Sequence, residues 1–253
     1  MVTQVKTAAE ITAMRESGRM LATVLQKLAR ELKPGMTTKD LANIAAAELE
    51  SLGGQPTFKG YQGFPDVICI SVNEEVVHGI PSSKKVINDG DIVGLDFGVT
   101  YKGMITDSAI SVIAGRAKQK GHLELVKNTE QAMLAGVAAL HDGIRTGDIG
   151  EAIEKSLNRN HYGIVRDLVG HGVGHELHED PNIPNYGRAN TGPWLHKGMT
   201  IAIEPMVTLG GGNVIVADDG WTILTADGSW AAHFEHTVLI TENGAEILTQ
   251  LPK

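Results

Sequence analysis

Four acidic residues lie in short apolar segments that alternate as β-strands do. These acids and their segments are Asp96 in 92–96, Asp107 in 106–110, Glu204 in 200–204 and Glu235 in 234–238. A buried carboxylate without a partner is costly or takes up a proton. An exposed strand face or an ion pair would explain any one of them. For four related acids this explanation weakens, because few lysines or arginines lie near these segments.

A segment rich in histidine and glycine, residues 168–181, is the second feature that could carry chemistry. It contains His171, His175 and His178, among glycines that permit close backbone approach. The spacing of His175 and His178 is one residue too short for the helical zinc-protease motif. The glycines do not match a dinucleotide-binding fingerprint either. His78 lies elsewhere, between a strand-like run and a turn.

A cluster of acids needs a positive partner, and a pair of divalent cations would supply it. Four carboxylates and one histidine without a thiolate suit Mn, Fe or Co, with Zn as an alternative. Two such ions about 3.5–4 Å apart generate a hydroxide and stabilise a tetrahedral intermediate. Nucleophilic catalysis is less favoured, because Cys69 lies in an apolar run and no serine has a nucleophile-elbow context.

An internal repeat relates the acids to one another. Amphipathic helices are expected at about 7–32, 38–53 and 118–142 and from 146 onward. The first of them opens with the capping-box sequence Thr7-Ala8-Ala9-Glu10. A shift of 108 residues aligns the first helix pair with the second and also Asp96 with Glu204. Asp107 aligns with Glu235 at a shift of 128, and the 20 additional residues contain glycine-rich turn signals.

These elements predict an α+β fold with pseudo-twofold symmetry. Two helix pairs are expected to cover an antiparallel sheet, and each half supplies two carboxylates. The repeat runs over about 7–113 and 118–240 within a single catalytic domain, 1–253, that no low-complexity linker divides. Chance similarity between amphipathic helices is the alternative, but one shift that aligns both helices and strands argues against it.

Composition narrows the class of protein further. The chain has 253 residues, a net charge of −8 and one cysteine, so it has no internal disulfide and no bulk attraction to nucleic acid. No apolar run approaches the ~18 residues of a membrane span, and residues 1–6 do not form a signal peptide. We therefore expect a cytoplasmic protein.

Seven residues, in this order and with these neighbours, resemble the short bacterial form of type I methionine aminopeptidases. They are His78, Asp96, Asp107, His171, His178, Glu204 and Glu235. The strings that carry the resemblance are VHGIP at 77–81, GHGVG at 170–174, IEPM at 203–206 and FEHT at 234–237. It extends over almost the whole chain. It implies the pseudo-symmetric pita-bread fold and the removal of initiator methionine from new proteins with a small second residue.

The resemblance also implies a role for each of these residues. Asp107 and Glu235 would bridge two divalent metals, Asp96 would chelate the second, and His171 and Glu204 would complete the first. A bridging hydroxide would attack the first peptide bond, and Glu204 would move the proton. His178 would stabilise the oxyanion, and His78 would hold the amide beyond the cleaved bond. The free α-amine of the substrate would bind at the second metal.

The methionine pocket implied by the resemblance is apolar. Its residues would be Phe58, Tyr61, Phe64, Cys69, Leu177 and Trp221. Phe58, Phe64 and Leu177 replace the Cys, Tyr and Phe of the best-known enterobacterial pattern, so the shape of the pocket should differ. Plain core packing is the alternative for these aromatic residues. The family also holds a monovalent cation on backbone oxygens, which here would lie near Asn73 and Glu75.

Two other functions stay open at this point. A proline-directed peptidase of the same fold usually carries a further N-terminal domain. A non-catalytic binding protein of this fold loses metal ligands, whereas all five positions are filled here. The expected partner is the N-terminal methionine of nascent peptides. We expect a monomer without nucleic-acid or membrane binding, and association with the ribosome is left open.

Overall fold

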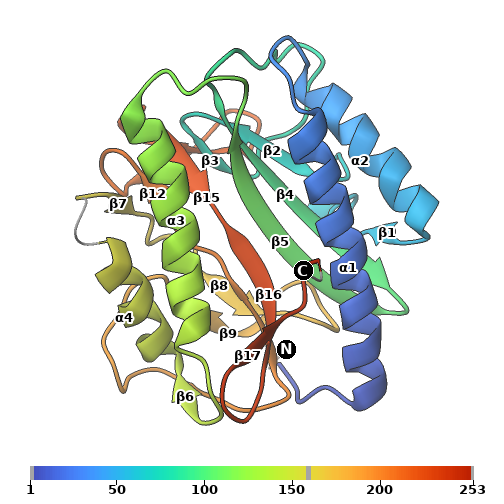
Figure 1. The fold of residues 1–253 in the computed structure, drawn as a ribbon, viewed down its shortest axis with the longest axis vertical. Helices are drawn as coiled ribbons and strands as arrows, with labels where there is room; N and C mark the ends of the chain where they lie inside the picture. Colours follow the sequence, from blue (N-terminus) through green and yellow to red (C-terminus); the bar gives the residue numbers. More distant parts are fainter. Residues whose placement is uncertain (1–2, 158–160, 252–253) are drawn as a thin grey trace.

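The structure is a computed structural model that describes residues 3–157 and 161–251 (Figure 1). Residues 1–2 of the N-terminal segment and 158–160 of the second repeat therefore lie outside it. The helices are α1 (Ala8–Glu31), α2 (Thr38–Leu52), the 3-10 turn η1 (Tyr61–Gly63), α3 (Lys120–Ala138) and α4 (Thr146–Leu157). The strands are β1 (Gln55–Pro56), β2 (Cys69–Val72), β3 (Glu75–Val77), β4 (Ile92–Tyr101), β5 (Met104–Ile113), β6 (Ile144–Arg145), β7 (Gly163–Ile164), β8 (Gly170–Gly172), β9 (Glu179–Ile183), β10 (Trp194–Leu195), β11 (Thr200–Ile203), β12 (Met206–Thr208), β13 (Val214–Val216), β14 (Ile223–Thr225), β15 (Ala231–His233), β16 (Glu235–Ile240) and β17 (Ala245–Ile247).

The helix ends follow from local sequence in most cases. Thr7 and Glu10 cap α1 reciprocally, as the capping-box sequence predicts. α2 ends at Gly53, whose φ of +79° favours glycine. The prediction for α3 was too long, because the helix ends at Ala138 rather than near residue 142. Beyond this point the hydrogen bonds span three residues, as in a 3-10 turn: the amide of Leu140 donates to the carbonyl of Val137.

The large sheet is antiparallel, as predicted. Its strand order is β1-β4-β5-β16-β11-β8-β9, with β2 also paired to β4 and β17 to β16. The pairs β4–β5 and β11–β16 are equivalent in the two halves, and β5 pairs with β16 where the halves meet. The 20 additional residues of the second half include the hairpin β13–β14. In Figure 1, α1 and α2 flank the first half and α3 and α4 the second.

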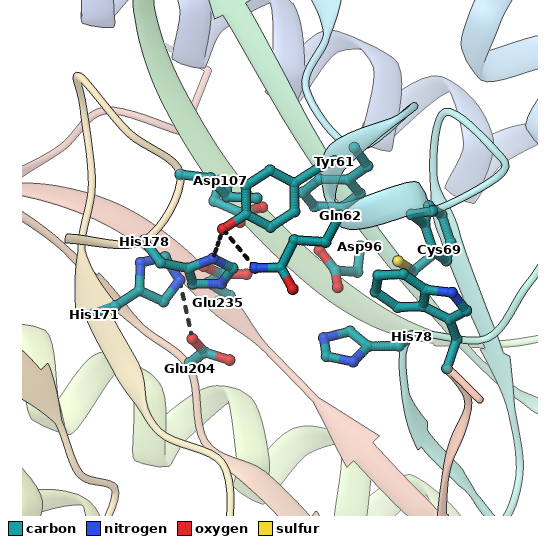
Figure 2. Close-up of a pocket in the computed structure, with 14 residues that line it drawn as sticks. Tyr61, Gln62, Cys69, His78, Asp96, Asp107, His171, His178, Glu204 and Glu235 are labelled. Carbon is teal, nitrogen blue, oxygen red and sulfur yellow. Dashed lines mark hydrogen bonds and ion pairs between the residues drawn. The ribbon is translucent and has the colours of Figure 1, made fainter. Parts of the chain in front are cut away.

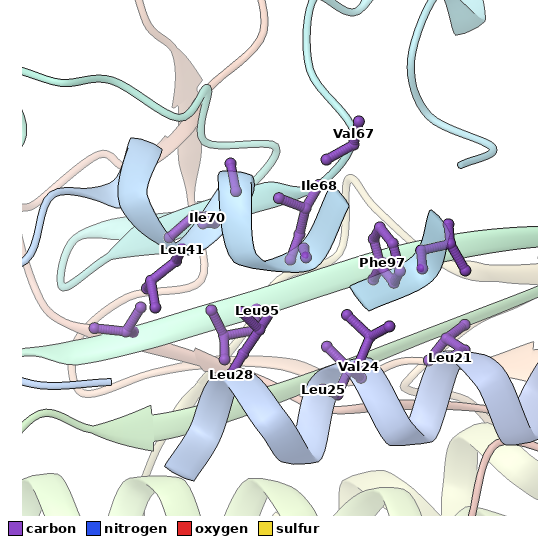
Figure 3. Packing of buried hydrophobic residues seen from close by; sticks show 14 of the residues in the cluster. Leu21, Val24, Leu25, Leu28, Leu41, Val67, Ile68, Ile70, Leu95 and Phe97 are labelled. Carbon is purple, nitrogen blue, oxygen red and sulfur yellow. The ribbon is translucent and has the colours of Figure 1, made fainter. Parts of the chain in front are cut away.

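The helices bury one face of this sheet. Leu95 and Phe97 of β4 pack against Leu21 and Leu28 of α1 (Figure 3). A similar core joins α3 and α4 to β11 and β16, through Ile203 and its neighbours. Side chains alternate along a strand, so the residues between these apolar positions face away from the helices. Among the described residues, no helix is long and apolar enough to cross a membrane.

Candidate active site

The register of the central strands brings the four acids together on the face opposite the helices. Directly opposed residues of an antiparallel pair point to the same face. Ala109 of β5 opposes Asp96 of β4 on one side and Glu235 of β16 on the other. Glu204 directly follows β11, which pairs with β16, and extends this row beyond Glu235. Asp107 is two residues from Ala109 on the same strand, so it shares this face.

β8 adds His171 beside Glu204 (Figure 2). Gly170 permits the approach, since a Cβ there would lie 2.3 Å from the carbonyl oxygen of Ala202. Nε2 of His171 lies 3.4 Å from Oε1 of Glu204, and its Nδ1 lies 2.9 Å from the carbonyl oxygen of Gly172. A carbonyl only accepts, so Nδ1 carries the ring proton and Nε2 keeps a free lone pair. Metal-ligating histidines have this arrangement.

The residues fit a metal site. One ligand atom each of Asp107, His171 and Glu235 lie within 4.8 Å of one another. Oδ1 of Asp96, Oδ1 of Asp107 and Oε1 of Glu235 are buried without a hydrogen-bond partner. Buried polar atoms normally have partners, and among the described residues no lysine or arginine lines this cavity. A carboxylate and imidazole set of this kind suits divalent transition metals.

Burial changes the ionisation of the acids. It raises the pKa of Asp107 to about 7 and the pKa values of Asp96, Glu204 and Glu235 well above their usual range. Mutual repulsion adds to this effect at the last three acids. Without a cation, the cluster therefore retains protons near neutral pH.

The histidines around the cavity are uncharged at neutral pH. Burial, together with repulsion from His178 when it is protonated, lowers the pKa of His78 to about 4 and that of His171 to about 3. Burial also lowers the pKa of His178 itself. Neutral imidazoles can donate or accept a hydrogen bond, so they suit the stabilisation of developing charge.

An apolar recess adjoins the acids. Cys69 of β2 opposes Asp96, and it is buried with Phe58, Phe64 and Leu177. The residues at the margin of the recess include Tyr61 and Trp221, and the ring of Phe64 meets the Trp221 ring edge-on at 5.2 Å. Phe58 packs on Gly98, and a Cβ at residue 98 would lie 2.6 Å from the Phe58 ring. Recess and acids form one cavity of about 150 Å³.

The η1 turn places a hydroxyl on His178. Oη of Tyr61 lies 2.8 Å from Nδ1 of His178 (Figure 2). Gln62 Nε2 donates to the same hydroxyl at 3.4 Å. The ring of His178 lies 4.3 Å from that of His171. The turn thus restrains the ring of His178 beside the acid cluster.

The structure places every residue of the predicted site around this cavity. The lining comprises Phe58, Tyr61, Phe64, Cys69, His78, Asp96, Asp107, His171, Leu177, His178, Glu204, Trp221 and Glu235, together with Gln62. The sequence reasoning missed Gln62, whose signal was its position next to Tyr61. It also missed His233, whose Nε2 lies 3.7 Å from Oε2 of Glu204. The individual roles of these residues stay predictions.

The expected monovalent-cation site lies outside the lining of this cavity. Asn73 occupies the β2–β3 turn with φ of +59°, and its carbonyl accepts from the amide of Ala231. Glu75 pairs with Lys85 and accepts from the amide of Val72. The cation there stays a prediction.

The fold and the acid–histidine cluster define a metallopeptidase. The sequence pattern of metallopeptidase family M24 matches residues 12–242, so the chain belongs to this family. Methionine aminopeptidase 1 of Bacillus subtilis is 45% identical over 246 residues, which cover 97% of this chain and 98% of that protein. Methionine aminopeptidase of Aquifex aeolicus is 42% identical, with 96% of each chain covered.

Solved structures agree with this assignment. The crystal structure of methionine aminopeptidase from Thermotoga maritima matches with a TM-score of 0.97 and 46% identity, over 99% of this chain and all of that one (100%). Prolidase from Pyrococcus furiosus shares the fold with a TM-score of 0.78 and 25% identity, but this chain covers 66% of it. The predicted pita-bread fold and the resemblance to methionine aminopeptidases are therefore confirmed.

Proposed function

We propose that this protein removes the N-terminal methionine from peptides and newly made proteins by metal-dependent hydrolysis, with a preference for a small second residue. The observation that carries this proposal is the single cavity that joins the acid–histidine cluster to an apolar recess. The names and nearly full-length similarity of the relatives support the same activity.

Two divalent ions, of Co, Mn, Fe or Zn, would be held by residues on adjacent strands. Asp107 and Glu235 lie on the central strands β5 and β16 and would help to hold both ions. Asp96 lies on the β4 flank, and His171 and Glu204 lie on the opposite flank. Such a pair supplies Lewis acidity and an activated water at neutral pH.

The apolar recess would hold the methionine side chain. The cavity of about 150 Å³ is many times larger than the roughly 10–15 Å³ that admits one water molecule. An unbranched thioether adapts to such a space and packs well on the aromatic rings of Phe58, Phe64 and Trp221. Because Cys69 opposes Asp96, the α-amine of the bound residue would lie near Asp96 on the β4 flank. An internal residue has no such amine, which restricts cleavage to the N-terminus.

Three residues would act on the peptide bond itself. Glu204 would accept a proton from the attacking water and return it to the departing amine, because a carboxylate whose pKa is raised by burial is a stronger base than a free one. With Tyr61 donating to Nδ1, His178 would carry its proton on Nε2 and donate to the developing oxyanion. His78, which follows β3 with φ of +60°, would hold the amide of the second residue.

Metal-dependent release of methionine tests the proposal directly. The protein would be stripped with a chelator, reloaded separately with Mn, Fe, Co or Zn, and given Met-Ala-Ser or an Ala-Pro peptide. We expect free methionine, detected by mass spectrometry, only from the reloaded protein and Met-Ala-Ser. Cleavage of the Ala-Pro peptide alone would favour the proline-directed activity. No cleavage by folded, metal-loaded protein would refute the proposal.

Matched variants test the residues. We expect Glu204→Gln and His171→Ala to lower kcat by about 100-fold or more, while the fold persists. Glu16→Gln and His196→Ala are the controls, because these side chains are about half exposed, at 47% and 55%. Full activity of either site variant would contradict its assigned role.

A further inference from the structure

The N-terminal residues 3–10, hereafter the N-terminal strap, lie against the loop that carries His178. This loop, residues 173–178, joins β8 to β9. The amide of Thr3 donates to the carbonyl of Asp180 at 2.6 Å, and the amide of Lys6 donates to the carbonyl of Gly198 at 2.8 Å. The strap thus packs against β9, directly after this loop, and against the segment before β11.

Lys6 and Glu179 form a buried ion pair between the strap and the end of this loop. Nζ of Lys6 lies 3.1 Å from Oε2 of Glu179, and both side chains are 0% exposed. Nζ also donates to Oγ1 of Thr3 and to the carbonyl of Gln4. A buried ion pair is often no more stabilising than a well-packed apolar pair. Stability alone is therefore a weak explanation for this one.

The second oxygen of Glu179 holds the loop. Oε1 accepts from the amide of His175 at 2.7 Å and from the amide of Glu176 at 3.1 Å. These two residues directly precede Leu177 and His178, both of which line the cavity. The carboxylate thus fixes the backbone from which both side chains project.

Two further contacts join the strap to the loop. Gly174 has φ of +149°, and a Cβ there would lie 2.4 Å from Cε of Lys6, so glycine leaves the space that the lysine occupies. Nε2 of His175 lies 2.8 Å from Oε1 of Glu10 in the first turn of α1. The loop is thereby held by the middle of the strap and by its C-terminal end.

We propose that Glu179 is a positioning residue for the reaction: its carboxylate caps the loop amides so that His178 and Leu177 face the cavity, and Lys6 holds that carboxylate in place. This inference rests on the proposed function, because it assigns a role to the loop in methionine release. Neither Glu179 nor Lys6 lines the cavity, so both act through the loop.

Two double variants separate positioning from stability. Lys6→Met with Glu179→Gln removes both charges but keeps a side-chain oxygen that accepts from the loop amides. Lys6→Met with Glu179→Leu removes both charges and that acceptor. We expect the first to retain kcat within about threefold. The second should lose kcat by about 10- to 100-fold, the cost of a catalytic group displaced by about 1 Å. Its KM should also rise, because Leu177 moves with the loop.

Hydrogen exchange supplies a readout that needs neither metal nor activity. In the metal-free protein we expect the amides of His175 and Glu176 to be protected in the wild type and the Gln variant. They should exchange at least about tenfold faster in the Leu variant. The exchange of Leu95, in the core of β4, should stay unchanged and serves as the control.

The outcomes distinguish the two proposals. Wild-type kcat or unchanged amide exchange in the Leu variant would overturn the positioning role. Absence of methionine release by the wild type would refute the proposed function, while the exchange result would still test the capping of the loop. If the Leu variant does not fold, Gly174→Ala replaces it: the substitution strains the loop at its φ of +149° and moves the end of Lys6 away from Glu179, so the same loss of kcat is expected and wild-type kcat would contradict the proposal.

Discussion

Replacing Asp107 with asparagine should stabilise the metal-free protein at neutral and alkaline pH. The carboxyl group is buried, and burial raises its pKa from 3.8 to about 7. Asparagine has nearly the same shape and no charge to bury. Its amide also donates hydrogen bonds, whereas Oδ1 of the carboxylate has no partner.

The sign of the pH dependence follows from proton linkage. The native protein binds the proton of Asp107 more tightly than the unfolded chain does, so the stability of the wild type falls as pH rises from 3.8 to about 7. The difference between these pKa values corresponds to roughly 4 kcal/mol. The advantage of Asp107→Asn should therefore be small at pH 4 and grow to roughly 4 kcal/mol by pH 7. It should not decline above pH 7, because the charge of Asp107 also raises the pKa values of Asp96, Glu204 and Glu235.

Urea unfolding in the presence of a chelator, followed by fluorescence between pH 4 and pH 8, measures this advantage. Asp218→Asn, at an exposed turn, is the matched control. Saturating metal should reverse the order, because ligand binding stabilises the wild type and the variant lacks one carboxylate. Two results would refute the inference that burial of the Asp107 charge destabilises the metal-free protein. One is an Asp107→Asn variant no more stable than the wild type at pH 8. The other is an equal gain in the free energy of unfolding at pH 5 and pH 8.

Three further outcomes are expected. Tyr61→Phe should lower kcat about tenfold with little change in KM, because His178 loses the hydroxyl at Nδ1; an unchanged kcat in steady-state assays would contradict this. Gly98→Ala should raise KM for Met-Ala-Ser about tenfold, since the new Cβ would lie 2.6 Å from the Phe58 ring and push it into the recess; an unchanged KM would be evidence against that pocket wall. Burial raises the pKa of the Cys69 thiol, so iodoacetamide at pH 8 should label native protein slowly and urea-unfolded protein rapidly; mass spectrometry that showed fast native labelling would disprove it.

Local signals in the sequence were sufficient for most of the architecture. The capping box at Thr7 and Glu10 and the glycine at Gly53 depend on contacts within a few residues, so the ends of α1 and α2 were predictable. The repeat related Asp96 to Glu204 because the same strand pair is built twice. The end of α3 at Ala138 was not predictable in this way, since an apolar stripe continues beyond the point where the chain tightens into turns.

The sequence by itself determined the chemistry of the site: carboxylates and imidazoles, in an order that resembles one family, beside apolar residues. Tertiary structure alone decided the distances and the environment. Tyr61 meets His178 across 117 residues of chain, and Lys6 meets Glu179 across 173. The raised pKa of Asp107 likewise arises from burial by segments remote in sequence. Spacing along a chain reveals which groups are present, whereas packing between distant segments sets their separation and their access to water, and with these their reactivity.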